Sequence, residues 1–334
     1  MPFTAIPRIP ALVGVPERKD QQGRVISPPK VYVNAAKNQV KPFVTTLDTD
    51  AISLGASAQR DYELRAPAEE NLLGDFEVAQ IVSQHSGRYT AEIFHSETDR
   101  AFQSRPVHVG CFAGSAQLPF ELWETFFVQA GGVSRVRLVN LETVTNTIRT
   151  AWKGRRFLGY AGYAGFTREE ILLSFARRHS HPYWLGTVTS PFTLTASQSR
   201  SNQPFTLLTG EADFEVDSIL YVASQGPGSI AIEIREGTSG RIIVGGNSTN
   251  GTVPANLVGG NAYLPAKLPD TWLIKRNTQV AMFVDELTGA ANEVYIYLHG
   301  RLLYDDEPGG KSVHTIPIPM AAKPIGVGWG GPRR

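Results

Sequence analysis

Hydrophobic and polar residues alternate along much of the chain with the two-residue period that is typical of β-strands. Runs of β-branched and aromatic residues recur, and clusters of Gly, Asn, Ser and Asp separate them. In the first half the pattern predicts strands at residues 44–52, 62–64, 76–82, 88–94, 107–112, 126–128, 136–139 and 147–152. In the second half it predicts strands at residues 192–195, 205–208, 212–216, 219–222, 230–235, 241–244, 272–274, 279–285 and 293–298.

Both halves therefore contain short strands without intervening helices, which excludes a parallel α/β sheet and favours an eight-stranded jelly roll. The halves also share landmarks in the same order, at an offset of about 140 to 150 residues, which indicates an internal duplication. The landmarks are an Asp-Phe-Glu-Val motif at 75–78 and 213–216, an alternating segment at 89–94 and 230–235, a Leu-Pro step before a tryptophan (Leu118-Pro119 with Trp123, Leu268-Pro269 with Trp272), and a strand-like run into Gly154-Arg155 or Gly300-Arg301.

The predicted fold is all-β, with two tandem duplicated β-sandwich domains of jelly-roll type joined by a short helix. Extended arms flank the domains at both ends. The predicted boundaries are an arm at 1–42, a first sandwich at 43–158, a connector at 159–186, a second sandwich at 187–305 and an arm at 306–334.

The two arms are rich in proline, which fixes φ and removes a backbone donor, so neither a helix nor a central strand is expected there. Such segments have no core of their own and become ordered by lying along a surface. Their large apolar residues are therefore candidate contacts with a partner, and Trp329 among glycines is a candidate anchor. The candidates are Phe3, Ile6, Ile9, Ile316, Ile318 and Trp329.

The connector contains the clearest helix signal of the chain. Thr167 followed by Glu170 forms a capping box, and the pattern predicts a helix over 167–178. Tyr160 and Tyr163 lie in the glycine-rich stretch before it and are further candidate contacts. A helix between domains packs against one of them or faces a partner subunit; the first reading is the commoner one.

Composition narrows the functional classes. The chain has 334 residues, with 32 basic and 31 acidic residues, so a net charge of +1 provides no overall field to attract nucleic acid or an anionic membrane. Its single cysteine, Cys111, excludes an intramolecular disulfide and a cysteine-rich zinc site, and is expected to be a buried small residue. The first residues lack the pattern of an export signal and no apolar run is long enough to span a membrane, so we expect a soluble protein made in the cytoplasm.

No catalytic, cofactor-binding or metal-binding residues are predicted, and no cofactor is expected. The chain has no phosphate-binding glycine loop, nucleophile elbow or His-Glu-x-x-His motif. His179 and His181 have the spacing of a cupin metal pair, but no carboxylate follows them, so a helix-end feature is favoured. Arg155 and Arg301 could bind an anionic glycan or carboxylate, although a salt bridge that closes each domain is favoured.

Tandem jelly-roll-like domains, proline-rich arms, near-zero charge and the lack of a catalytic signature together resemble structural proteins of tailed-bacteriophage virions. The resemblance is to capsid decoration and minor capsid proteins and to collar and tail-ring components, and it concerns construction rather than a motif. It implies a non-enzymatic virion protein that forms a homo-oligomer and contacts major capsid, portal or tail proteins through its arms. Membranes and specific nucleic acids are not expected partners.

Two alternatives remain open at this point. One is a glycan- or receptor-binding module that uses Tyr160, Tyr163, Trp184 and the long loop at 245–266 as a platform. The other is a bicupin-type metalloenzyme.

Overall fold

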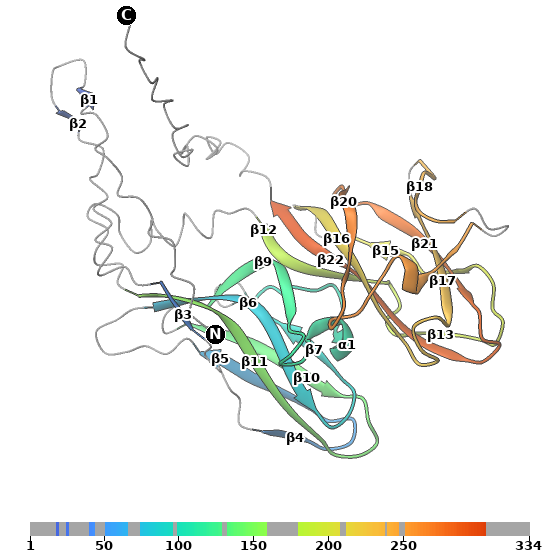
Figure 1. Cartoon of the computed structure of the whole chain (residues 1–334), viewed down its shortest axis with the longest axis horizontal. Coiled ribbons are helices and arrows are strands. Elements are labelled where there is room, and N and C mark those ends of the chain that lie inside the picture. Colours follow the sequence, from blue (N-terminus) through green and yellow to red (C-terminus); the bar gives the residue numbers. More distant parts are fainter. Residues whose placement is uncertain are drawn as a thin grey trace, which may run out of the picture.

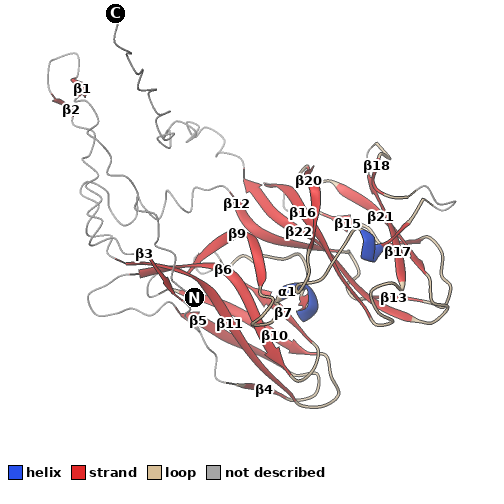
Figure 2. Cartoon of the chain, viewed as in Figure 1, coloured by secondary structure: helices blue, strands red, loops and turns tan. Residues whose placement is uncertain are grey.

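The computed structural model describes residues 51–65, 74–95, 99–128, 132–158, 180–207, 212–237, 239–246 and 251–304, and three short strand segments at 18–19, 25–26 and 40–43. Two β-sandwiches lie side by side, the first coloured blue to green and the second yellow to red (Figure 1). Nearly all of the described chain is strand or loop (Figure 2). The prediction of an all-β fold built from sandwich domains is confirmed.

The first sandwich has two antiparallel sheets. One sheet has the order β3 (Val40–Phe43), β11 (Asn146–Leu158), β6 (Gly74–His85) and β9 (Phe120–Val128), with β4 (Ile52–Leu54) also on β11. The other has the order β5 (Gln59–Arg65), β10 (Val133–Asn140), β7 (Tyr89–Ile93) and β8 (Val107–His108). A separate pair is formed by β1 (Arg18–Lys19) and β2 (Val25–Ile26).

The second sandwich repeats this arrangement. Its first sheet has the order β12 (Ser180–Gly186), β22 (Asn292–Tyr304), β16 (Ala212–Ala223) and β20 (Ala266–Ile274), with β13 (Phe192–Leu194) also on β22. In the other sheet, β21 (Gln279–Glu286) lies between β17 (Ile230–Glu236) and the short strands β14 (Ser201–Asn202) and β15 (Phe205–Thr206). The outer strands on β17 are β18 (Ile242–Val244) and β19 (Val253–Pro254).

In both sandwiches the successive strands pair in the order of a jelly roll, first with eighth, eighth with third and third with sixth. A register shift follows Val78 in β6 and Val216 in β16, with Gly154 and Gly300 opposite. Asn146 and Asn292 each bind the turn that follows the third strand, through Ser86 or Ser224. A duplication would leave these correspondences; the duplication itself stays a prediction.

One landmark of the proposed repeat was aligned wrongly. In the structure Phe126 and Trp272 occupy the same register, opposite Val78 and Val216, so Trp123 and Trp272 do not correspond. The Leu-Pro step that matches Leu118-Pro119 is Leu264-Pro265, because Ser115 N donates to Leu118 O as Asn261 N donates to Leu264 O. The sequence contains a second Leu-Pro pair, Leu268-Pro269, and matching this pair placed the step four residues too far along the chain.

Three expected elements differ from the structure. Residues 107–112 were expected to form one strand, but only β8 is extended, because His108 caps the short helix α1 (Val109–Phe112) by accepting from Gly110 N. The two strands expected at 212–216 and 219–222 are one strand, β16, interrupted by a bulge. Strand β12 lies in the stretch assigned to the connector, so the second sandwich begins by Ser180. The expected helix at 167–178 lies outside the described residues.

Each sandwich has a hydrophobic core between its sheets, and the core of the first continues into the second. Trp184, Leu220, Tyr295 and Tyr297 of the second sandwich belong to the same buried cluster as the first sandwich's core. The two sandwiches therefore share a buried apolar interface, which places them against each other.

Candidate functional site

The interface between the sandwiches is organised by strand β22, whose side chains alternate between two environments. Val294, Ile296 and Leu298 point into the core of the second sandwich. The residues between them, together with Trp184, Leu220 and Val222, face the first sandwich, and we call this contact the seam. The row on β22 consists of Glu293, Tyr295, Tyr297, His299 and Arg301.

The centre of the seam is apolar and closely packed. Tyr297 Oη donates to Pro106 O at 2.7 Å and accepts from His108 N at 3.2 Å. The indole of Trp184 is fully buried and donates to Cys111 O at 3.1 Å. These bonds satisfy the polar atoms of two large aromatic side chains. Burial of the two rings therefore stabilises the seam without leaving a hydroxyl or an indole nitrogen unpaired.

Helix α1 lies against the second sandwich (Figure 1). Gly110 O accepts from Ala262 N at 2.7 Å, and a Cβ added at Gly110 would lie 2.7 Å from Val222 Cγ2. Glycine therefore permits a backbone-to-backbone bond across the seam at this point.

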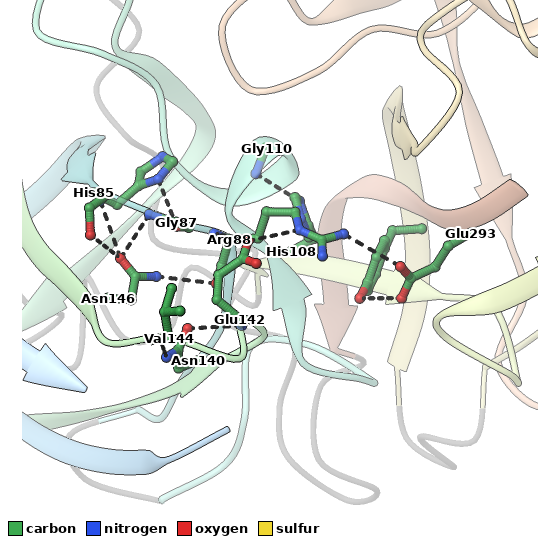
Figure 3. Close-up of polar contacts among 12 residues, drawn as sticks. His85, Gly87, Arg88, His108, Gly110, Asn140, Glu142, Val144, Asn146 and Glu293 are labelled. Carbon is green, nitrogen blue, oxygen red and sulfur yellow. Dashed lines mark hydrogen bonds and ion pairs between the residues drawn. The ribbon is translucent and has the colours of Figure 1, made fainter. Parts of the chain in front are cut away.

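One end of the seam is a polar network (Figure 3). Arg88 lies between Glu142 of its own sandwich at 3.0 Å and Glu293 of the other at 3.5 Å. Glu293 also accepts from Tyr295 Oη at 3.2 Å, and Asn146 binds Gly87 N and Arg88 O, which positions the arginine backbone. The hydrogen bond that Arg88 donates to Glu142 is the main cause that raises the pKa of Arg88, so the guanidinium stays charged.

His108 lies beside this network and is 4% exposed. Because Nδ1 accepts from Gly110 N at 3.1 Å, the neutral ring carries its hydrogen on Nε2, which is buried and has no hydrogen-bond partner among the described residues. The ring contacts Tyr295 at a centroid distance of 4.6 Å. Burial, with the nearby positive charge of Arg88, lowers the pKa of His108 to about 4.

A second buried histidine, His299, lies further along the row. Its Nδ1 is 2.9 Å from Asp217 Oδ1, the bulge residue of β16, and Ser218 Oγ donates to the same carboxylate oxygen at 2.7 Å. Ser218 Oγ is also 3.3 Å from Nδ1. The other side of the ring packs on Phe120 and Trp184, with centroid distances of 5.2 and 5.0 Å.

These are the residue types of a serine hydrolase triad in a different arrangement. In a triad the serine and the carboxylate bind opposite ring nitrogens, so that the ring can take the proton of the serine. Here both lie at Nδ1, whereas Nε2 is buried without a hydrogen-bond partner in the described chain. The geometry instead fixes the orientation of the ring within the seam.

Arg301 ends the row with two carboxylates. It lies 2.8 Å from Glu215 of its own sandwich and 3.3 Å from Glu124 of the first, and its guanidinium lies over Trp123 at 4.7 Å. The favoured interpretation of Arg301 as a salt-bridge residue is confirmed, and the bridge also joins the two sandwiches. Nothing is described for the Arg155 side chain.

The structure places few of the candidate residues from the sequence. All eight candidate partner contacts lie outside the described residues: Phe3, Ile6, Ile9, Tyr160, Tyr163, Ile316, Ile318 and Trp329. His181 lies on β12 with its ring 5.2 Å from that of His95, and burial lowers its pKa to about 4. Cys111 is fully buried, as expected, and burial raises the pKa of its thiol.

Sequence reasoning missed the seam. The signal was present in the Tyr-x-Tyr-x-His spacing of residues 295–299, where the positions between Val294, Ile296 and Leu298 are also large and mainly aromatic. A strand that is apolar on both faces is buried on both faces, which in an antiparallel sandwich requires a partner beyond the core.

Within the described chain, no group of three or more His, Cys, Asp or Glu side chains is arranged to hold a metal ion. No described helix is long and apolar enough to cross a membrane.

No family model and no curated protein matches the chain. Among solved structures it is similar to N-glycanase F (PNGase F), at 8% identity and a TM-score of 0.30, over 77% of this chain and 94% of that one. It is also similar to the PBSX exported protein XepA, at 12% identity and a TM-score of 0.19, over 86% and 99% of the two chains. TM-scores this low carry no argument about function.

Proposed function

We propose that the chain is a non-enzymatic structural protein of a phage virion, which assembles with copies of itself and with capsid, neck or tail proteins through its terminal arms. The seam is the observation that carries the proposal. Its central side chains Tyr295, Tyr297 and His299 are between 0% and 3% exposed, and charged pairs lie at both ends. Such an interface joins two sandwiches into one building unit, as a structural component of a particle requires.

The N-terminal arm supports the second half of the proposal. Its last residues form β3, which pairs with the edge of β11 from Gly154↔Phe43 to Phe157↔Val40. Strand β12 occupies the same edge of the second sandwich. The fold therefore accepts an added strand at this edge, and strand addition is a common way for an arm of one protein to bind another.

The proposal is tested first by the solution mass of the full-length protein, measured by light scattering beside a variant that lacks residues 1–39 and 305–334. This variant keeps β3 and both sandwiches. We expect a defined oligomer for the full chain and a folded monomer, or a smaller oligomer, for the trimmed one. Equal masses for the two proteins would show that the arms do not drive assembly.

The virion assignment needs a separate measurement. Phage particles purified from cells that produce the protein are analysed by quantitative mass spectrometry. We expect the protein at a fixed number of copies per particle after a density gradient and a high-salt wash. Its absence from intact particles would contradict the assignment.

One observation bears on the glycan-binding alternative. Trp184, one of its proposed platform residues, is fully buried in the seam and is therefore not available for stacking on a sugar. The structural role is the proposal that the described residues support better.

A further inference from the structure

Each sandwich has two faces of the kind that meet in the seam. One, which we call the helix face, contains the short helix before the sixth strand and the sixth strand itself: α1 and β9, or η2 (Ala255–Leu257) and β20. The other, the row face, is the outward row of the eighth strand, β11 or β22. The seam uses the helix face of the first sandwich and the row face of the second. The opposite two faces are not used in it.

The unused faces correspond to the used ones residue by residue. Gly114 and Gly260 each form a bridge with the third strand, to Val82 and Leu220, and this aligns α1 with η2. The shared register of Phe126 and Trp272 places Asp270 at the position of Glu124. Likewise, the backbone of Arg155 lies opposite that of Glu77 in the register of β11 and β6, as Arg301 lies opposite Glu215, so Arg155 holds the register position of Arg301.

Exposed leucines mark the unused helix face. Leu257 of η2 is 70% exposed, whereas Cys111 at the same position of α1 is fully buried in the seam. Leu264, in the turn before β20, is 68% exposed, and its counterpart Leu118 on the used face is also exposed, at 46%. The difference between the faces is therefore at Leu257, which a contact like the seam would cover as the seam covers Cys111.

One pair of opposite charges matches between the unused faces, although β20 also exposes Lys267. The unused row on β11 contains Arg149 and Lys153, with Arg155 at the next register position. On the unused helix face, Asp270 is exposed in β20 at the position from which Glu124 reaches Arg301. Contact between the two faces would bring Asp270 to Arg155 in the way that the seam brings Glu124 to Arg301.

On the unused faces, two polar residues stand where the seam has its close contact between a glycine and a valine. In the seam, Gly110 packs against Val222. The corresponding residues are Asn256 of η2 and Gln84 of β6, the strand beside the row on β11, and both are exposed. Two side-chain amides facing each other can hydrogen-bond, so the unused faces match each other although they do not copy the seam.

From these correspondences we infer that copies of the chain associate head to tail, with the helix face of one copy's second sandwich on the row face of the next copy's first sandwich. The contact is heterologous, so it joins further copies into a ring where the rotation between copies closes and into an open filament where it does not. Within either assembly, sandwiches of the two kinds alternate, joined by the seam inside each chain and by a related contact between chains. The inference rests on the proposed self-assembly through the arms and adds the sandwich surfaces that meet when the arms join two copies.

Charge reversal in the full-length protein tests the pairing. Asp270→Arg and Arg155→Glu are each expected to shift the mass measured by light scattering towards that of a monomer, and the double variant is expected to restore the oligomer. Glu63→Arg is the matched control, because Glu63 is an exposed carboxylate on β5, in the other sheet of the first sandwich. Single variants that keep the wild-type mass would overturn the pairing and leave the proposed function standing.

A second measurement does not depend on charge reversal. Chains with Asp270→Cys are mixed with chains with Arg155→Cys and treated with a short bismaleimide. We expect dimers that contain one chain of each kind, and none from wild-type protein, whose only cysteine is buried. In the positive control, Glu124→Cys with Arg301→Cys links within one chain and leaves the mass unchanged. A control that links while the mixture does not, or a wild-type protein that is monomeric at all concentrations, would overturn the inference.

Discussion

Among single residues, the bulge residue Asp217 has two hydrogen-bond partners at one atom, because one buried carboxylate oxygen contacts both His299 and Ser218. Asp217→Ala would leave the Nδ1 hydrogen of His299 with only the longer contact to Ser218 Oγ at 3.3 Å, at a cost of about 1–3 kcal/mol. Ser218→Ala keeps the histidine bond and is expected to cost about 1 kcal/mol or less. Urea unfolding at pH 7 measures both. Equal losses for the two variants would show that Asp217 does not orient the ring.

His108 predicts a pH dependence with a definite sign. In the folded protein its pKa is lowered to about 4 by burial, whereas the unfolded histidine titrates near 6.5. Between these values the unfolded chain binds the extra proton, so stability falls as the pH is lowered from about 6.5 to about 4. A shift of this size corresponds to about 3 kcal/mol.

The variant that isolates this contribution is His108→Asn, because asparagine can still cap α1 but does not titrate. We expect the free energy of unfolding of the variant to fall less steeply across this window than that of the wild type. Above pH 7.5 the difference between the two should be constant. Part of the slope will persist, because His181 also has a pKa of about 4. Parallel curves over the whole range would contradict the role of His108.

Among the elements, strand β22 passes closest to its neighbour β16 at Gly300, opposite the register shift. A Cβ added at Gly300 would lie 1.9 Å from Glu215 O and 2.9 Å from Val216 Cα, and backbone atoms cannot move aside as a side chain can. Gly300→Ala is therefore expected to cost about 3 kcal/mol or more. The control is Gly55→Ala, whose nearest atom is Ala58 Cβ at 4.0 Å, with a cost within about 0.5 kcal/mol. Thermal unfolding distinguishes these outcomes.

The elements also show what the sequence could predict and why. The alternation of hydrophobic and polar residues located β10, because one face of that strand contacts solvent and burial alternates at every residue. It ended β22 at residue 298, although the strand extends to Tyr304, because Tyr297 and His299 are buried as Ile296 and Leu298 are, so the contrast between the two faces disappears there. It divided β16 in two, since the bulge residue Asp217 shifts the period by one. The seam joins residues that are far apart in the sequence, such as Pro106 and Tyr297 at a separation of 191 positions, and a local pattern contains no information about such pairs.

In the whole molecule, the shared core leads us to expect that the two sandwiches unfold as one cooperative unit. Tyr297 is buried in the cluster of the first sandwich although it belongs to the second, and it bonds to Pro106 and His108 across the seam. Removing such an interface lowers the stability of both partners, and each then unfolds according to its own core. A protein that must act as a rigid component benefits from this coupling, because neither sandwich can open without breaking the contact with the other.

Tyr297→Ala tests the coupling, with Leu298→Ala as its neighbour on the same strand. Both remove a large buried side chain, at a cost of about 2–5 kcal/mol, but Leu298 lies in the second sandwich's own core. We expect calorimetry to show one transition for the wild type and for Leu298→Ala, lowered in the variant, and two transitions for Tyr297→Ala. A single transition in all three proteins would mean that the rest of the seam, with Trp184 at its centre, couples the sandwiches without Tyr297. Two transitions in the wild-type protein would contradict the expectation that the sandwiches unfold together.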